Sequence, residues 1–328
     1  MPDPPALRTG VLPVPPLDPV DAAVANVVSP KTKEVYLRHI RGFLTDLEAL
    51  FGIGPHEANY DHLLRWWSWL REREDSLGRR LGPSAINGRV AAVKRFYREG
   101  VRREFFPSNP AEGVPSLRVS KQPKGRALLP DEARALLEAC PWDGTLLDFR
   151  DRVALTLLLL TGARSSEAIA LRVEDFREDL GVRVVTFQRK GGLSDQQKVT
   201  AELALLLDAW LHRASLGTGA LLRALVPMGG GRYVIRPGPL SARTLHRIVK
   251  GRGAAAGLGD DVGPHDLRRT WITAADEMGV KLTKLSRSAG HADPATTMAY
   301  IHHRDLLVDH PSDAVAKWLA KKEQDDLS

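Results

Sequence analysis

Cysteine is almost absent from this chain of 328 residues, which contains Cys140 alone. One thiol excludes an internal disulfide and is typical of a protein kept in a reducing compartment. We interpret Cys140 as a small, buried apolar residue rather than a nucleophile.

Long apolar runs are also missing. The longest stretch, around Val153 to Leu160, falls well short of the ~20 residues that a membrane helix needs. The first residues, Met-Pro-Asp-Pro-Pro, lack the basic and then apolar pattern of a secretion signal. We therefore expect a cytoplasmic protein.

Metal and nucleotide sites lack their usual patterns. His302-His303, Asp260-Asp261 and His265-Asp266 offer ligands, but their spacing matches no compact metal motif, and no acidic cluster suits two-metal hydrolysis. The glycines at 229–231 are not followed by the Lys-Ser/Thr pair of a phosphate loop. We expect neither a metal nor another cofactor.

Positive charge is in excess, with 47 Lys and Arg against 40 Asp and Glu, a formal net charge of +7. A basic balance fits a nucleic-acid partner, because neutralising phosphates drives much of such binding. The excess is modest evidence by itself, since many basic proteins bind no DNA.

The side chains that can carry chemistry are concentrated in a few short motifs. These are Thr161-Gly-Ala-Arg164-Ser-Ser-Glu167, Lys190, His265-x-x-Arg268, Gly290-His291 and Tyr300. Arginine forks bind the non-bridging oxygens of a phosphate, a phenol can attack phosphorus, and imidazole or ammonium groups can move protons. The combination predicts phosphoryl transfer on a phosphodiester without a metal ion.

The order and spacing of these motifs resemble the tyrosine recombinase (phage integrase) family, in a Xer-like form. Arg164 is followed by Glu167 and Leu171, and Tyr300 stands nine residues after His291. The resemblance extends to Pro264 and Thr296-Thr297 and covers roughly residues 25 to 305. Each fragment alone is weak, but together and in this order they are specific.

The resemblance implies a role for each residue of the site. Arg164 and Arg268 would hold the non-bridging oxygens, and Tyr300 would attack, leaving a 3′-phosphotyrosine and a free 5′-hydroxyl. His265 and His291 would bind the phosphate and assist proton transfer. Lys190 would be the general acid for the 5′-oxygen, on a hairpin whose length departs from the common family form. Glu167 would orient Arg164 or a histidine.

The expected fold is mainly α with a small β-hairpin or three-stranded sheet, arranged as a two-domain DNA clamp. We assign residues 1–20 to a disordered proline-rich tail, 21–113 to a helical core-binding (SAM-like) domain, 114–126 to a linker and 127–328 to the catalytic domain. Ser29-Pro30 should begin the first helix, 63–70 should lie in a second, and Ser84 should cap a third that runs toward Val101.

The third helix has an apolar and a basic side. Ile86, Val90, Val93 and Tyr97 recur at helical spacing and should face a core. We predict DNA contacts from its basic residues and from the linker, although a merely solvated surface is the alternative. The predicted contacts are Arg89, Lys94, Arg95, Arg98, Arg102, Lys121 and Lys124.

Periodicity predicts the elements of the second domain. Helices are expected at 148–160, 201–213, 241–255, 265–278, 284–289, 294–302 and 314–321, and 182–187 should pair with 197–200 as strands. Gly162 should cap the first of these helices just before Arg164. The glycine-containing region 217–238 shows no legible pattern.

The predicted function is site-specific DNA recombination, with strand exchange inside a homotetramer on two duplex sites. The C-terminal helix, with Trp318 and Leu319, would dock either within its own protomer or on a neighbour. Two alternatives stay open: a type IB topoisomerase-like relaxing enzyme, and a non-catalytic, integrase-derived regulator that binds DNA. The target site, any second recombinase or accessory protein, and the choice among chromosome-dimer resolution, phage integration and mobile-element movement stay open.

Overall fold

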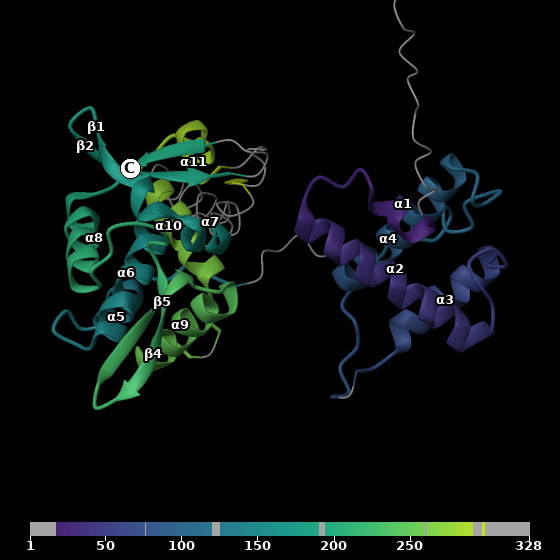
Figure 1. Cartoon of the computed structure of the whole chain (residues 1–328), viewed down its shortest axis with the longest axis horizontal. Helices are drawn as coiled ribbons and strands as arrows, with labels where there is room; N and C mark the ends of the chain where they lie inside the picture. The colour runs from purple at the N-terminus through teal and green to yellow at the C-terminus, as the bar shows by residue number, and fades with distance from the viewer. Residues whose placement is uncertain are drawn as a thin grey trace, which may run out of the picture. The chain divides into compact units, whose positions relative to one another are not determined.

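The computed structural model describes residues 18–75, 77–119, 125–189, 194–259, 261–290 and 297–298 (Figure 1). The chain divides into two compact units, residues 1–121 and 122–328. Each unit has its own hydrophobic core. The fold is mainly helical with small antiparallel sheets, which confirms the predicted class.

The N-terminal unit is helical: α1 (Pro19–Val24), α2 (Pro30–Phe51), α3 (Tyr60–Glu72) and α4 (Pro83–Arg102). Helix α4 packs against the other three. At the centre, the ring of Phe43 lies edge-on to Trp66 and Tyr97, with centroids 4.9 and 6.0 Å apart. Edge-to-face packing of this kind adds to the free energy of burial. The predicted apolar side of α4 is buried as expected.

Helix starts in this unit partly follow the prediction. Ser29 caps α2 with Pro30 in its first turn, as predicted. Helix α4 instead begins at Pro83 after Gly82, so the assignment of Ser84 as its cap was wrong. Helix α1 lies partly inside the tail predicted to be disordered. It forms because the Asp18 carboxylate accepts the backbone N–H groups of Val20 and Asp21 at 2.6 and 3.1 Å.

The C-terminal unit is built around α6 (Leu146–Thr161), in which eleven of sixteen residues are buried. Such a helix, apolar on nearly all sides, needs neighbours all round. The elements that pack directly on it are α5 (Pro130–Glu138), α7 (Ser165–Ala170), α8 (Ala201–Arg213), α9 (Ala242–Ala255) and α10 (Pro264–Glu277). Helix α11 (Leu282–Ala289) packs on α10.

Among the residues described for this unit, two antiparallel sheets accompany the helices. After the 3₁₀ turn η1 (Val173–Asp175), strands β1 (Phe176–Asp179), β2 (Val182–Gln188) and β3 (Ser194–Lys198) form a three-stranded sheet in sequence order. The second sheet is a hairpin of β4 (Arg223–Gly229) and β5 (Arg232–Pro239). It occupies the region in which the sequence showed no pattern. Glycines 229–231 all take positive φ at its turn, and strand glycines and prolines hide the alternation.

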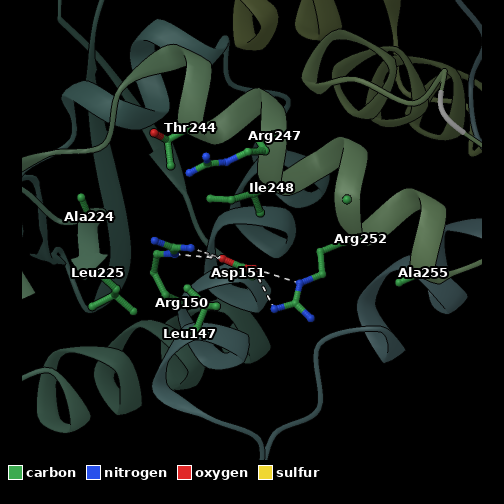
Figure 2. Close-up of a pocket in the computed structure, with 11 residues that line it drawn as sticks. Leu147, Arg150, Asp151, Ala224, Leu225, Thr244, Arg247, Ile248, Arg252 and Ala255 are labelled. Carbon is green, nitrogen blue, oxygen red and sulfur yellow. Dashed lines mark hydrogen bonds and ion pairs between the residues drawn. The ribbon is translucent and has the colours of Figure 1, made fainter. Parts of the chain in front are cut away.

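A pocket of about 380 Å³ lies where α9 crosses α6 and β4 (Figure 2). At its floor the buried Asp151 carboxylate accepts from Arg150 Nη2 at 2.5 Å and from Arg252 Nε at 2.9 Å (Figure 2). The Arg252–Asp151 ion pair fastens α9 to α6, whereas Arg150 and Asp151 both lie on α6. Among the described residues, those predicted for the active site do not line this pocket.

Two further predictions concern burial and membranes. Cys140 is buried, and its burial raises the pKa of the thiol to about 12, so it is a core residue as interpreted. Within the described ranges, no helix is both long and apolar enough to cross a membrane.

Candidate active site

Arg164 is placed by the turn between α6 and α7. Gly162 ends α6 in the left-handed conformation, with φ +61°, as predicted. A Cβ at this position would collide with the ring of Trp271, so glycine is needed for space as well as for φ. Arg164 then caps α7, and its backbone N–H donates to Glu167 Oε2 at 2.8 Å. The turn therefore fixes both the position of Arg164 and its link to Glu167.

The Arg164 guanidinium reaches from this turn to α11. Nη1 donates to Glu167 Oε1 at 2.7 Å, and Nη2 donates to the carbonyl of Gly290 at 3.0 Å. The side chain is still 40% exposed. Glu167 is only 6% exposed. Burial would raise the pKa of its carboxyl, but hydrogen bonds from Arg164 and Arg189 outweigh burial and hold that pKa below 4.5.

Arg268 lies on α10 and is 2% exposed. Its Nη1 donates to the carbonyl of Gly162 at 2.5 Å, and its Nη2 to the carbonyl of Ala289 at 2.5 Å. These carbonyls stand at the C-terminal ends of α6 and α11, where helices leave acceptors unsatisfied. Arg268 therefore joins three helices at one point.

The two arginines meet at one turn of the chain. Arg268 binds Ala289 and Arg164 binds Gly290, the left-handed cap that ends α11. Ser286 of the same helix donates to the Thr297 hydroxyl at 2.9 Å, and Thr297 is buried. The residue three before Tyr300 thus packs against the helix whose end both arginines hold.

His265 belongs to the first turn of α10 and is exposed. It lines a hollow of about 490 Å³ together with Ser165, His246 and Asp266. Desolvation and the positive charges of Arg269, Arg268 and Arg164 lower the pKa of His265 below 6.5, against the opposing charge of Asp266. At neutral pH the imidazole is therefore uncharged and able to accept a proton.

Several predicted site residues lie outside the described residues. These are Lys190, His291 and Tyr300 of the predicted catalytic set and Lys121 and Lys124 of the predicted linker. The structure thus brings together Arg164, Glu167, His265 and Arg268. In the part of the chain that it describes, no group of three or more His, Cys, Asp or Glu side chains could hold a metal ion.

The basic residues predicted on the third helix divide into two kinds. Arg95 donates to the carbonyl of Ala23 at 2.7 Å and to Asn26, so it ties α4 to α1 and its neighbouring turn. Arg98 and Arg102 are exposed and flank the buried Glu99 at 3.9 and 3.2 Å. Arg89 is half-buried and donates to the carbonyl of Ala85, and Lys94 is half-buried as well. The regular spacing of basic residues along the helix did not reveal which arginines bond within the N-terminal unit and which face outward.

Two residues near the site were not predicted. Arg189, considered only as a neighbour of Lys190, is buried and bonded to Glu167 at 2.6 Å. His246 of α9 lines the hollow beside His265. The sequence offered one indication for Arg189. It directly follows an alternating apolar strand, and a charged residue that is buried in such a place needs partners.

The profile of the phage integrase family matches residues 126–306, more than half of the chain. The chain belongs to the phage integrase family. A tyrosine recombinase XerC of Mycobacterium bovis is 32% identical over 277 residues, which cover 80% of this chain and 87% of the relative. One from Pelobacter propionicus is 29% identical over 280 residues, covering 84% and 85%. The protein is a tyrosine-type site-specific recombinase, as the motifs predicted.

Solved structures share the fold of this recombinase. A lambda integrase (75–356) dimer bound to a COC′ core site superposes with a TM-score of 0.64 at 14% identity, covering 86% of this chain and 92% of that chain. The XerH recombinase in a post-cleavage complex with a palindromic difH substrate gives a TM-score of 0.62 at 18% identity, covering 88% and 79%. At these identities the likeness is one of fold.

Proposed function

We propose that this recombinase breaks and rejoins duplex DNA through a covalent 3′-phosphotyrosine at Tyr300. The phenol oxygen forms the new bond to phosphorus, the bond from phosphorus to the 5′-oxygen breaks, and that oxygen takes up a proton. Rejoining reverses these steps with the 5′-hydroxyl of the exchanged strand. The phosphoester link conserves the energy of the broken bond, so rejoining needs no ATP.

The observation that carries this proposal is the meeting of Arg164 and Arg268 at Ala289-Gly290. Two guanidiniums from separate helices, held at one turn, make a site for a phosphate, because each offers paired donors and a permanent charge. The next residue in sequence is His291. Thr297, packed on the same helix, brings the chain to within three residues of Tyr300.

The remaining roles follow from chemistry and from the family. His265, uncharged at neutral pH, would accept a hydrogen bond or proton from the attacking phenol or the phosphate. Lys190 would protonate the 5′-oxygen as it leaves, and His291 would bind the phosphate. Glu167 keeps Arg164 in place. Loss of one charge-stabilising donor typically slows an enzyme by about 10²–10³.

We infer that the substrate is duplex DNA, that four protomers assemble on two sites, and that residues 21–113 and 127–328 clasp the duplex across a linker. Lambda integrase has been solved as a tetramer bound to a Holliday junction. In the N-terminal unit the exposed Arg98 and Arg102, together with Lys94 and Arg89, would contact phosphates. Lys121 and Lys124 would do so from the linker.

Covalent trapping tests this function. Nicked duplexes from DNA that flanks the gene would be incubated with the protein and quenched in SDS. We expect a slow-migrating adduct with the wild type and none with Y300F, which keeps the ring but removes the nucleophile. Binding without an adduct would support the regulator, whereas relaxation of supercoiled DNA by a monomer would support the topoisomerase.

A further inference from the structure

Arg189 is the last residue before Lys190 and directly follows strand β2. Its side chain is 8% exposed, and its guanidinium bonds to three different elements. Nη1 donates to Glu167 of α7 at 2.6 Å, and Nη2 donates to Asp195 of β3 at 2.7 Å and to the carbonyl of Ser288 in α11 at 3.0 Å. Nε adds a second bond to Asp195 at 3.2 Å. A buried guanidinium with this many partners is fixed in orientation.

Two of these partners also determine where Arg164 points. Glu167 Oε2 accepts a hydrogen bond from Arg189 Nη1, and Glu167 Oε1 accepts one from Arg164 Nη1. Ser288 lies two residues before Gly290, whose carbonyl accepts from Arg164 Nη2. Arg189 therefore holds both the carboxylate and the helix end to which Arg164 is bonded. Gly290 leaves room for this, since a Cβ there would lie 2.9 Å from the Arg189 guanidinium carbon.

We propose that Arg189 is a positioning residue that aims Arg164 at the scissile phosphate, an inference that rests on the proposed function. With Arg189 present, Glu167 is shared and can offer Arg164 Nη1 only one oxygen. Without it, Oε2 keeps only the Arg164 backbone N–H as a partner, and its remaining lone pair is open to the Arg164 fork, which prefers a bidentate carboxylate. Arg164 would then turn toward Glu167 and leave Gly290, away from the phosphate.

The substrate charge gives a readout that a purely structural role would not move. A methylphosphonate at the scissile position replaces one charged oxygen by a methyl group, so the reaction no longer needs a guanidinium to neutralise that oxygen. If Arg189 acts through Arg164, R189Q should slow cleavage of the phosphodiester by roughly 10–100-fold. The same variant should slow cleavage of the methylphosphonate far less, and R164Q should show the same selectivity.

Two comparisons separate positioning from folding. R183Q is the matched control, because Arg183 also lies on β2 and pairs with an acid, Asp208 of α8 at 2.8 Å, so that its ion pair involves neither Glu167 nor α11. R183Q should leave the ratio of the cleavage rates of the phosphodiester and the methylphosphonate unchanged. R189K should recover little, because one ammonium cannot replace a planar fork. R164Q/R189Q should cleave no more slowly than R164Q, since both changes remove the same interaction.

The proposal for Arg189 would be overturned if R189Q lost the same factor in cleavage rate on both substrates. It would also be overturned if the rate losses of R164Q and R189Q were additive in the double variant. Failure of the wild type to form any covalent adduct would instead overturn the proposed function. A crystal structure of R189Q would then test the role of Arg189 without a measurement of activity. The proposal predicts Arg164 bidentate on Glu167 and released from Gly290, and an unchanged Arg164 would refute it.

Discussion

Arg164 and Arg268 are equivalent in the proposed chemistry but differ in burial, and this difference separates their effects. Arg164 is 40% exposed and bonded to one carboxylate and one carbonyl. Arg268 is 2% exposed and joins the ends of two helices. Removing a buried group that satisfies other polar atoms leaves those atoms unpaired, which costs stability as well as rate.

Substitution of the two arginines should affect cleavage rate and stability differently. R164Q should lower the single-turnover cleavage rate by about 10²–10³ while the melting temperature changes little. R268Q should lower both, because the carbonyls of Gly162 and Ala289 lose their donor. Rates and thermal melts of the two variants would be measured beside R172Q, an exposed arginine paired with Glu174. A normal rate in R164Q would contradict the proposed role of Arg164.

The lowered pKa of His265 makes its contribution to stability depend on pH. Because its pKa in the fold lies below the 6.5 of an unfolded histidine, the native state binds fewer protons between these two values. The stability from His265 is therefore complete above pH 6.5 and is lost as the pH falls through its folded pKa. NMR titration, with H265Q to assign the signal, should give a midpoint below 6.5. A midpoint above 6.5 would contradict the lowering of this pKa by desolvation and by the arginine charges.

Among the elements, the turn from α6 to α7 controls the site most directly. Gly162 and Gly181 both have positive φ, at +61° and +74°, but of these two only Gly162 lacks space for a Cβ. G181A should therefore cost about 1–2 kcal/mol for the left-handed conformation alone. G162A should cost more and should also slow cleavage, since displacing Trp271 disturbs α10 and Arg268. Urea unfolding of both variants tests this, and equal costs would contradict it.

Helix α4 yields a prediction about DNA affinity. R98Q and R102Q should weaken DNA binding, and each substitution that frees one phosphate should reduce the slope of log K against log salt by about 0.9. R95Q should mainly destabilise the N-terminal unit, because it removes the bonds to Ala23 and Asn26. Salt-dependent binding and thermal melts distinguish the two kinds of arginine. A salt slope lowered by R95Q alone would reverse the assignment.

The elements also show what local sequence can predict. Helix α6 and its Gly162 cap, α2 with Ser29, and strand β2 were predicted because periodicity and caps are local signals. The β4–β5 hairpin was missed, since its glycines and prolines break the alternation. The cap of α4 was misplaced by two residues, because Pro83 begins the helix without a side-chain cap. The partners of Arg189 are distant in sequence, and no local pattern reveals them.

At the scale of the whole molecule, the chain comprises two units with separate cores, and the described site lies wholly in the second. Motif order predicted the family correctly because Arg164 and the His265–Arg268 pair of α10 come from distant stretches that this fold brings together. Arg164 and Arg268 both bond to the end of α11, which explains why motifs so far apart in sequence occur together.

We infer that these groups serve a covalent step at Tyr300. To test this step, the protein would be trapped on a nicked duplex, the adduct digested with nuclease and protease, and the modified peptide mapped by mass spectrometry. We predict a nucleotide joined through its 3′-phosphate to Tyr300. An adduct on another residue, or one joined through a 5′-phosphate, would contradict the account.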